Sequence, residues 1–313
     1  MPPKEIKTHK MANTTPLRYP GGKTKLLPYL HNIIKQNNLH DPVYVEPFCG
    51  GCGLALELLC SYTAGKIILN DLDRAIYAFW HETINNPKEL CKKIESTPCN
   101  IDTWNKQREV WQNRSAAPLP DLAFATFFLN RTNRSGILDA GVIGGKEQSG
   151  KWKMNARYNT SDLIRRIEKI GQLKSRIELY NLEAISFLEK ITPQLPKNSL
   201  IYLDPPYVKK GPGLYLNYYK EKDHKLLAEH VQNKIKTPWI VSYDDHPIIK
   251  SLYNDRQTQT LDFTYSAHSA TKAGRELIFF SEDITPPDMK NSKFRTKKPW
   301  DSTVPSASIT EHI

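Results

Sequence analysis

The sequence lacks the features that would place it outside the cytoplasm. Its 313 residues include only five cysteines, at irregular positions, which suits a reducing compartment better than a disulfide-bonded scaffold. No apolar run reaches the roughly 18 residues that a membrane-spanning helix needs. The first ten residues, MPPKEIKTHK, also lack the apolar stretch of a signal peptide. We therefore expect a cytoplasmic protein with no membrane partner, and we expect it to be monomeric.

Motifs for metal or redox chemistry are also missing. Cys49 and Cys52 form a C-x-x-C pair, but no second pair follows and the other cysteines are scattered. The sequence contains no H-E-x-x-H motif. Because protein zinc sites draw on a cluster of such ligands, we expect no metal site.

A complete phosphate-binding loop is absent as well. The segment Pro20-Gly-Gly-Lys-Thr24 imitates the end of one, but Leu17 stands where the pattern requires glycine. Pro16 and Pro20 prevent a regular strand from leading into it. These departures disfavour a nucleoside triphosphatase.

Positive charge is abundant by comparison. Lys and Arg number 44 against 33 Asp and Glu, for a net charge of +11. An excess of this size favours a polyanionic partner such as nucleic acid, since binding releases counterions. Part of the excess lies near the C-terminus, at positions such as Lys293 and Arg295, where solvation alone accounts for it.

Strand and helix patterns alternate through the middle of the chain. Runs of β-branched and aromatic residues predict strands at 43–45, 67–69, 200–203, 239–241 and 276–280. Helical patterns occupy 54–60, 75–84, 226–235 and the residues from Pro247 onward. This order predicts an α/β fold with a doubly wound, Rossmann-like, mostly parallel sheet covered by helices on both faces.

Composition divides the chain further. Residues 1–15 are polar and lack periodicity, so we expect a mobile segment, and the Pro-, Ser-, Thr- and Lys-rich residues 282–313 predict a disordered tail. Residues 85–175 interrupt the alternation with helices and then a long polar segment. We interpret 85–175 as an inserted, mostly helical subdomain, and 16–84 with 176–281 as the main α/β domain.

A glycine-rich turn, Glu46-Pro-Phe-Cys-Gly-Gly-Cys-Gly53, follows the first predicted strand. Glycines there let the backbone approach a cofactor and turn sharply into a helix. Asp71 closes the next strand, where an acid can accept hydrogen bonds from ribose hydroxyls. The spacing differs from G-x-G-x-x-G, which disfavours NAD. A turn needed only for packing remains an alternative.

The tetrapeptide Asp204-Pro-Pro-Tyr207 ends the buried strand at 200–203. Doubly wound folds bind ligands at such strand ends. Asp204 and the Pro205 carbonyl can accept both hydrogens of an exocyclic amino group, while Pro206 fixes the turn and Tyr207 offers a face for stacking. This pattern predicts a site for a planar amino-bearing base, against the alternative of a rigid turn without a ligand.

In order, these segments resemble the motifs of the Dam-type DNA adenine-N6 methyltransferases, over residues 14–281. The matching segments are Arg18-Tyr-Pro-Gly-Gly-Lys23, Glu46-Pro-Phe-Cys-Gly-Gly51, Leu69-Asn-Asp71, Asn130-Arg131-x-x-x-Ser-Gly136, Lys151–Asn159 and Asp204-Pro-Pro-Tyr207. The resemblance implies an enzyme that methylates adenine in duplex DNA with S-adenosylmethionine as donor. It implies the catalytic residues Asp204, Pro205, Pro206 and Tyr207.

The resemblance also implies a set of residues at the S-adenosylmethionine site. These are Tyr19, Lys23, Glu46, Phe48, Gly50, Gly51, Asp71 and Asp204. Cys52 departs from the small residues that are common in the glycine loop of the family, which puts its contact with the donor in doubt.

The insert would then be the target-recognition region. Candidate DNA contacts are Asn130, Arg131, Asn133, Arg134, Lys151, Lys153 and Arg157. Arginine reads guanine and asparagine reads adenine in the major groove, whereas most such residues only hold phosphates. The sequence differs from the GATC-specific members at Thr132–Ser135, so the target sequence stays open.

Other functions remain as alternatives. These are cytosine-N4 transfer, methylation of an RNA or protein amide, and a catalytically inactive DNA-binding module. A restriction endonuclease encoded nearby is a candidate partner. For Ser242–His246, which follows another strand, we favour Asp245 as the N-cap of the next helix over a place at the pocket border.

Overall fold

The computed structural model describes residues 14–19, 22–208, 219–267 and 270–288. One seven-stranded sheet has the order β3-β2-β1-β4-β5-β7-β6. Its strands are β1 (Val43–Glu46), β2 (Lys66–Asn70), β3 (Ile177–Tyr180), β4 (Ser199–Leu203), β5 (Trp239–Asp244), β6 (Thr258–Ala267) and β7 (Ala270–Phe280). Strands β1 to β5 pair in parallel, and β7 runs antiparallel to both β5 and β6.

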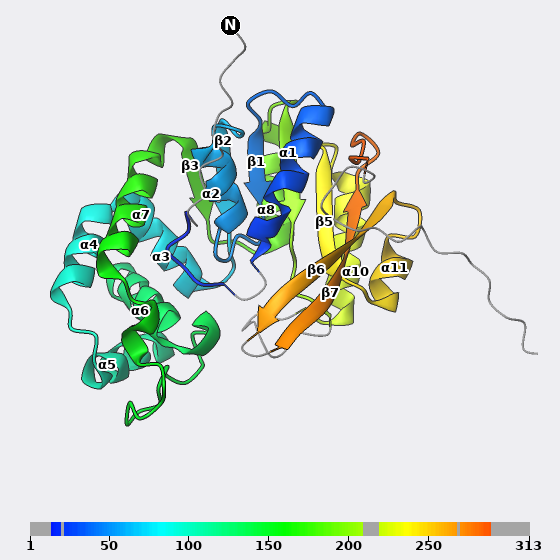
Figure 1. The fold of residues 1–313 in the computed structure, drawn as a ribbon. Helices are drawn as coiled ribbons and strands as arrows, with labels where there is room; N and C mark the ends of the chain where they lie inside the picture. Colours follow the sequence, from blue (N-terminus) through cyan, green and yellow to red (C-terminus); the bar gives the residue numbers. More distant parts are fainter. Residues whose placement is uncertain (1–13, 20–21, 209–218, 268–269, 289–313) are drawn as a thin grey trace, which may run out of the picture.

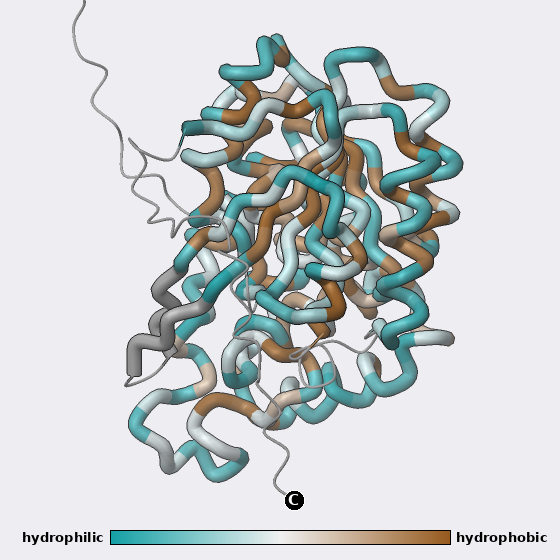
Figure 2. Tube along the Cα trace, turned by 90° about the vertical axis from the view of Figure 1, so that its right-hand side faces the viewer, coloured by the Kyte–Doolittle hydropathy of each residue, from teal (hydrophilic) through white to brown (hydrophobic). Residues whose placement is uncertain are grey.

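Alternation of side chains along the strands produces two separate cores. Tyr44 on β1 and Tyr202 on β4 face one core, whereas their neighbours Val45 and Ile201 face the other. Both cores are apolar because a parallel sheet covered on two faces leaves no side for water. Figure 2 shows hydrophobic residues concentrated along the middle of the molecule and hydrophilic residues toward its outside.

Helices cover both faces of the sheet (Figure 1). The first core receives α1 (Leu27–Gln36), α2 (Gly53–Cys60) and α3 (Arg74–Asn85), together with the insert. The second core receives α8 (Ala184–Ile191), α10 (Glu221–Lys234) and α11 (Pro247–Leu252). The doubly wound α/β fold that the sequence predicts is therefore present.

Between α3 and β3 the chain forms four further helices: α4 (Pro87–Ser96), α5 (Ile101–Gln112), α6 (Leu119–Thr132) and α7 (Thr160–Gln172). They lie beyond the β3 edge of the sheet, within the predicted insert 85–175 (Figure 1). Helix α6 is buried on most sides and packs against α3 and α5. The insert thus shares a hydrophobic core with the α/β part, and the proposed domain boundaries stay predictions.

Strand order creates a crevice where the site is expected. Strand β1 pairs with β2 on one side and β4 on the other, so the chain winds in opposite directions from β1. Doubly wound folds bind ligands at the carboxyl ends of strands at such a reversal. The insert loop after α6 and the β6–β7 hairpin both extend past the sheet on that side (Figure 1).

Several local predictions need correction. Strands β3 and β6 are not among the predicted strands, although Thr258–Ala267 contains several β-branched and aromatic residues and Ile177–Tyr180 alternates apolar with polar residues at its start. Leu226, expected on the buried face of α10, is 54% exposed. Residues 282–288 belonged to the predicted tail, yet Ile284 is buried and the Thr285 amide donates to Asn37 Oδ1 at 2.8 Å. Within 1–15, Thr14 is also buried; residues 1–13 and 289–313 lie outside the described residues.

The start of α11 also differs. His246 is its N-cap, with Nδ1 3.3 Å from the amide of Ile248, and not Asp245. Asp245 instead pairs with Lys250 at 2.6 Å. None of the helices in the described part of the chain combines the length and apolar character needed to cross a bilayer.

Candidate active site

A cavity of about 630 Å³ opens at the carboxyl ends of β1, β2 and β4. Its walls include residues 15–19 and 22–24 of the N-terminal segment, the glycine-rich turn 46–54, residues at the ends of β2 and β4, and the insert loop 135–139. The volume lies within the range that small-molecule sites occupy. The fold thus brings the separate sequence motifs to one place.

The glycine-rich turn lies directly against Tyr19. A Cβ atom at Gly50 would lie 2.7 Å from the Tyr19 ring, and one at Gly51 would lie 2.5 Å from Tyr19 Cβ. Gly50 also has φ +45°, a backbone conformation that favours glycine. Trp80 Nε1 donates to the Gly50 carbonyl at 2.8 Å. Both glycines are therefore needed for the turn and the aromatic wall to fit together.

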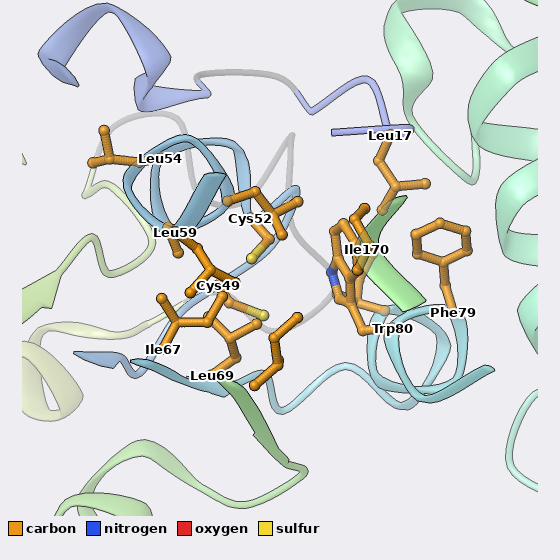
Figure 3. Close-up of a cluster of buried hydrophobic side chains, with 14 of the residues drawn as sticks. Leu17, Cys49, Cys52, Leu54, Leu59, Ile67, Leu69, Phe79, Trp80 and Ile170 are labelled. Atoms are coloured by element: carbon orange, nitrogen blue, oxygen red, sulfur yellow. The ribbon is translucent and has the colours of Figure 1, made fainter. Parts of the chain in front are cut away.

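Cys49 and Cys52 belong to the packing beneath this turn. Figure 3 shows their sulfur atoms among apolar side chains, near Ile67, Leu69 and Trp80. Burial raises the pKa of both thiols, so neither is a ready nucleophile or metal ligand. Cys52 adopts φ +51° as the residue before α2, a conformation that glycine adopts more readily.

Asp71 fixes the turn from the end of β2. Its Oδ2 accepts a hydrogen bond from the Gly50 amide at 2.8 Å, and its Oδ1 accepts one from the Asp73 amide at 2.9 Å. Burial raises the pKa of the Asp71 carboxyl to about 7, and the nearby Asp73 adds to the effect. Asp71 therefore couples the ends of β1 and β2 and remains within the cavity wall.

Glu46 ends β1 as a buried acid in the cavity wall. Its side chain accepts a hydrogen bond from the Tyr44 hydroxyl at 3.1 Å. Burial raises the pKa of the Glu46 carboxyl to about 8, and the negative charge of Asp204 contributes. A cationic ligand in the cavity would offset this penalty and favour the ionised form.

Asn70 ties three strand ends together. Its Nδ2 donates to the carbonyls of Pro47 and Leu182, each at 3.0 Å, and its Oδ1 accepts from the Leu182 amide at 2.9 Å. These partners follow β1 and β3, whereas Asn70 ends β2. Since the side chain is 1% exposed, its role is to position the surrounding loops.

Asp204 follows β4 and keeps 23% of its side chain exposed at the cavity. Its Oδ1 pairs with Lys23 Nζ at 2.8 Å and accepts from Ser242 Oγ at 3.1 Å. No donor within the described residues reaches Oδ2. Burial raises the pKa of the Asp204 carboxyl, and Lys23 partly counteracts it. One oxygen is thus anchored while the other is left to accept from a ligand.

Tyr207 ends the Asp204-Pro-Pro-Tyr207 turn that follows β4. Lys23 Nζ donates to its hydroxyl and lies 4.6 Å from the centre of its ring. The hydroxyl donates in turn to Glu276 Oε1 at 2.9 Å. Three segments therefore hold this tyrosine: the turn after β4, the helical turn η1 (Lys23–Leu26), and β7.

Comparison with known proteins identifies the arrangement. A family model described as "D12 class N6 adenine-specific DNA methyltransferase" matches residues 19–268. The chain belongs to this family. It is accordingly a DNA methyltransferase that acts on adenine N6, and the alternative of cytosine-N4 transfer finds no support.

Individual relatives of the methyltransferase are distant. Type II methyltransferase M.MjaIII of Methanocaldococcus jannaschii is 21% identical over 207 residues, which cover 61% of this chain and 68% of that protein. The rRNA methyltransferase aviRa of Streptomyces viridochromogenes has a TM-score of 0.41 at 11% identity, over 88% of this chain and 95% of that one. Protein LPL1258 of Legionella pneumophila has a TM-score of 0.28 at 13% identity, over 84% and 86%.

The methyltransferase structure gathers the residues expected at the donor and base sites. The cavity wall contains Tyr19, Lys23, Glu46, Phe48, Gly50, Gly51, Asp71, Asp204 and Pro206. Pro205 and Tyr207 occupy the same turn as Asp204. Their individual roles toward ligands remain proposals.

Two of the expected DNA contacts are placed differently. Asn130 is 1% exposed and bonds the main chain at Arg18 and Gly136, with distances of 2.7 to 2.8 Å. Asn133 is 0% exposed, and its Oδ1 accepts from Trp104 Nε1 at 2.7 Å. The Asn133 amide is closed off from the surface and joins the insert to α5. The Asn130 amide borders the cavity, but its hydrogen bonds join the insert to the N-terminal segment.

The cations of the insert divide into two groups. Arg131 is half-buried, and its Nε donates to the Arg157 carbonyl at 2.7 Å. Burial, with Arg18 and Arg166 nearby, lowers the Arg131 pKa to about 10. Arg134, Lys151, Lys153 and Arg157 are exposed. The second group therefore retains the surface position that DNA contact requires.

Two polar residues beside Asp204 and Tyr207 are not among the predicted site residues. Ser242 belongs to the segment for which a place at the pocket border is the second interpretation, and its contact with Asp204 Oδ1 agrees with that alternative. Glu276 appeared only as the start of a strand. The available sequence signal was a serine within the run Trp239–Tyr243 and a glutamate directly before the apolar run Leu277–Phe280.

Proposed function

We propose that the methyltransferase transfers a methyl group from S-adenosylmethionine to N6 of an adenine flipped out of duplex DNA. The observation that carries the proposal is Asp204, which presents one oxygen to the cavity while Lys23 and Ser242 hold the other. An anchored acceptor of this kind suits an exocyclic amino group that donates two hydrogens.

The cavity fits the proposed donor. Glu46 and Asp71 are acids with raised pKa values in its wall, so a positively charged ligand relieves their unfavourable burial. Asp71 also lies where ribose hydroxyls are bound in doubly wound folds, and the glycine turn lets a ligand approach the main chain. When bound, S-adenosylmethionine supplies a methyl group that carries its own leaving group.

Asp204 would act on the geometry and charge of the target nitrogen. The N6 lone pair is delocalised into the adenine ring, which makes it a poor nucleophile. Accepting the amino hydrogens at Asp204 and the Pro205 carbonyl favours a pyramidal nitrogen. The carboxylate also stabilises the positive charge that develops on N6 during transfer. Positioning of the two reactants can contribute roughly 7–11 kcal/mol.

The flipped base would stack on Tyr207, whose ring is fixed by Lys23 and Glu276. Extrusion of a base costs a few kcal/mol, and contacts in the pocket must offset this free energy. A ring held at its hydroxyl loses little freedom when the base arrives.

Duplex DNA would lie across the insert. Arg134, Lys151, Lys153 and Arg157 are exposed there, and loop residues 135–139 line the cavity itself. The same segment can therefore contact the duplex and border the flipped base. Arg131 is better suited to positioning the Arg157 main chain than to reading bases.

Product analysis tests this function. The purified protein, incubated with labelled S-adenosylmethionine and duplex DNA, should form N6-methyladenine, and a chelator should leave the rate unchanged. Sequencing of DNA from an expressing, methylation-free host with modified-base detection would give the recognition sequence. Formation of N4-methylcytosine, or methylation of RNA but not DNA, would refute the proposal.

We further propose a restriction endonuclease as functional partner, because the relative from Methanocaldococcus jannaschii is named a type II methyltransferase. Digestion of host DNA by extracts of the source cells, blocked by prior methylation with this protein, would support it. The cytoplasmic location and the monomeric state stay predictions.

A further inference from the structure

Glu276 is an acid in an apolar environment. It lies on β7 with 2% exposure, next to the buried residues Leu277 and Ile278. A buried carboxylate is costly unless it is paired, and an apolar residue would serve packing better. Its partners include Tyr207, whose hydroxyl donates to Oε1 at 2.9 Å, and Lys23, whose Nζ lies 3.5 Å from the same oxygen.

Both partners contact the catalytic turn. Lys23 bonds Asp204 Oδ1 at 2.8 Å and donates to the Tyr207 hydroxyl. A continuous chain of contacts therefore runs from Glu276 through Tyr207 and Lys23 to Asp204. Since these residues come from β7, η1 and the turn after β4, this series of contacts joins three elements that are distant in sequence.

We propose that Glu276 is a positioning residue for methyl transfer. Its carboxylate fixes the Tyr207 ring by the hydroxyl and holds the Lys23 ammonium against Asp204, so that the Asp204 oxygen facing the cavity keeps its direction. Glu276 acts only through these two residues and does not touch the substrate. The inference rests on the proposed roles of Asp204 and Tyr207.

The variant Glu276→Gln tests it with little change in shape. Glutamine keeps an oxygen for the Tyr207 hydroxyl but loses the charge that attracts Lys23. We expect kcat to fall by about 10- to 100-fold, the scale of a small misplacement of reacting groups. KM for DNA and for S-adenosylmethionine should change less than about twofold, because the residue contacts neither. The control is Glu282→Gln, an 85% exposed carboxylate paired with Arg256.

A pH profile of single-turnover methyl transfer separates positioning from a merely structural role. The charged and polar groups around Asp204 are Lys23, Glu276, Glu46, Ser242 and Tyr202. Glu276 raises the Asp204 pKa, so Glu276→Gln should move the acid limb of the profile to lower pH. Glu276→Asp, which keeps the charge, should leave the limb closer to that of the unaltered enzyme.

A double-mutant cycle with Tyr207→Phe gives a second readout. If Glu276 acts through the hydroxyl, Glu276→Gln should cost much less in the Tyr207→Phe background. Equal losses in both backgrounds, or a kcat for Glu276→Gln within about twofold of the unaltered enzyme with an unmoved acid limb, would overturn the inference. Asp204→Asn is measured in parallel. If Asp204→Asn is impaired while Glu276→Gln is not, only the proposed role of Glu276 is wrong. If Asp204→Asn keeps full activity, the proposed function of Asp204, on which the inference about Glu276 rests, is wrong.

Discussion

Glu46 and Asp204 follow adjacent strands and lie in the same cavity, but their surroundings differ. Asp204 has the Lys23 ammonium at 2.8 Å, whereas the Glu46 carboxyl accepts hydrogen bonds from neutral groups, the Tyr44 hydroxyl and the backbone at Ala55. The balance of burial and pairing therefore favours a charged Asp204 more than a charged Glu46. We therefore propose that Asp204 stabilises the developing charge on the base and that Glu46 faces a cationic part of the donor.

Replacing Asp204 by Asn should remove most of the catalysis. Asparagine keeps one acceptor but lacks the charge that stabilises positive charge on N6, so we expect turnover to fall roughly 10²–10³-fold. DNA binding should persist, because the phosphate contacts that we propose lie on the insert. Single-turnover kinetics with a fluorescent base analogue would separate flipping from transfer. Asp245→Asn, which alters an acid paired with Lys250 beside the site, is the control; an equal loss in both variants would contradict the assignment.

Donor binding should release protons through Glu46. The pKa of this carboxyl is raised to about 8, so it is largely protonated at pH 7 in the free protein. A cationic ligand favours the ionised form, which means that affinity should rise as the pH increases from 6 to 8. Calorimetry in buffers of different ionisation enthalpy would measure the protons released.

Glu46→Gln serves as the comparison for this measurement. It should release fewer protons than the unaltered protein at pH 7, and its affinity should depend less on pH. Subtracting the two data sets cancels the titration of the donor itself. The same proton release in both proteins would exclude Glu46 as the partner of the cationic part.

At the scale of elements, the turn between β1 and α2 depends on contacts that no single segment supplies. Asp71 from the end of β2 binds the Gly50 amide, Trp80 from α3 binds its carbonyl, and Tyr19 packs on both glycines. The turn is thus held from three directions. Its shape should be sensitive to a single added methyl group.

Gly51→Ala tests this sensitivity. The new Cβ would lie 2.5 Å from Tyr19 Cβ, so Tyr19 or the turn must move. We expect affinity for S-adenosylmethionine to fall by about tenfold or more, equivalent to about 1.4 kcal/mol. The same change at Gly145 strains a backbone at φ +78°, but its added Cβ meets nothing within 4 Å and the residue lies outside the cavity wall, so donor binding should stay intact. Unchanged affinity in a folded Gly51→Ala protein, measured by calorimetry, would show that Tyr19 does not border the donor.

For the molecule as a whole, the net charge of +11 is useful only where cations are exposed toward DNA. The insert supplies such cations, while many others are distributed over the surface; Lys190 on α8, for example, covers the opposite face of the sheet. Binding strength and sequence preference should therefore depend on different residues of one loop.

Two variants separate these effects. Lys151→Ala should weaken binding to all sequences equally and reduce the slope of log affinity against log salt by about 1. Arg134→Ala should change the preference among sequences, because a guanidinium can bond two acceptors of guanine. Lys190→Ala is the control for charge alone. A uniform loss of affinity for Arg134→Ala across a panel of sites would reduce its role to phosphate contact.

The sequence by itself determined the three strands that carry the site (β1, β2 and β4), the glycine turn and the tetrapeptide Asp204-Pro-Pro-Tyr207. Each depends on local chemistry, namely β-branched runs, glycines and a proline turn. Such patterns can be recognised from a few neighbouring residues. The resemblance to a family added the donor and the target base. Asp71 and Asp204 could be placed at strand ends for the same reason.

Only the tertiary structure decided which polar residues serve the site and which serve packing. Asn130 and Asn133 resemble base-reading residues in sequence, yet they are buried and bond the main chain. Glu276 resembles an ordinary strand residue, yet the antiparallel pairing of β7 with β5 places it opposite Asp244 and within reach of Tyr207. Burial and pairing between distant segments depend on how the sheet is assembled, so local sequence patterns do not predict them.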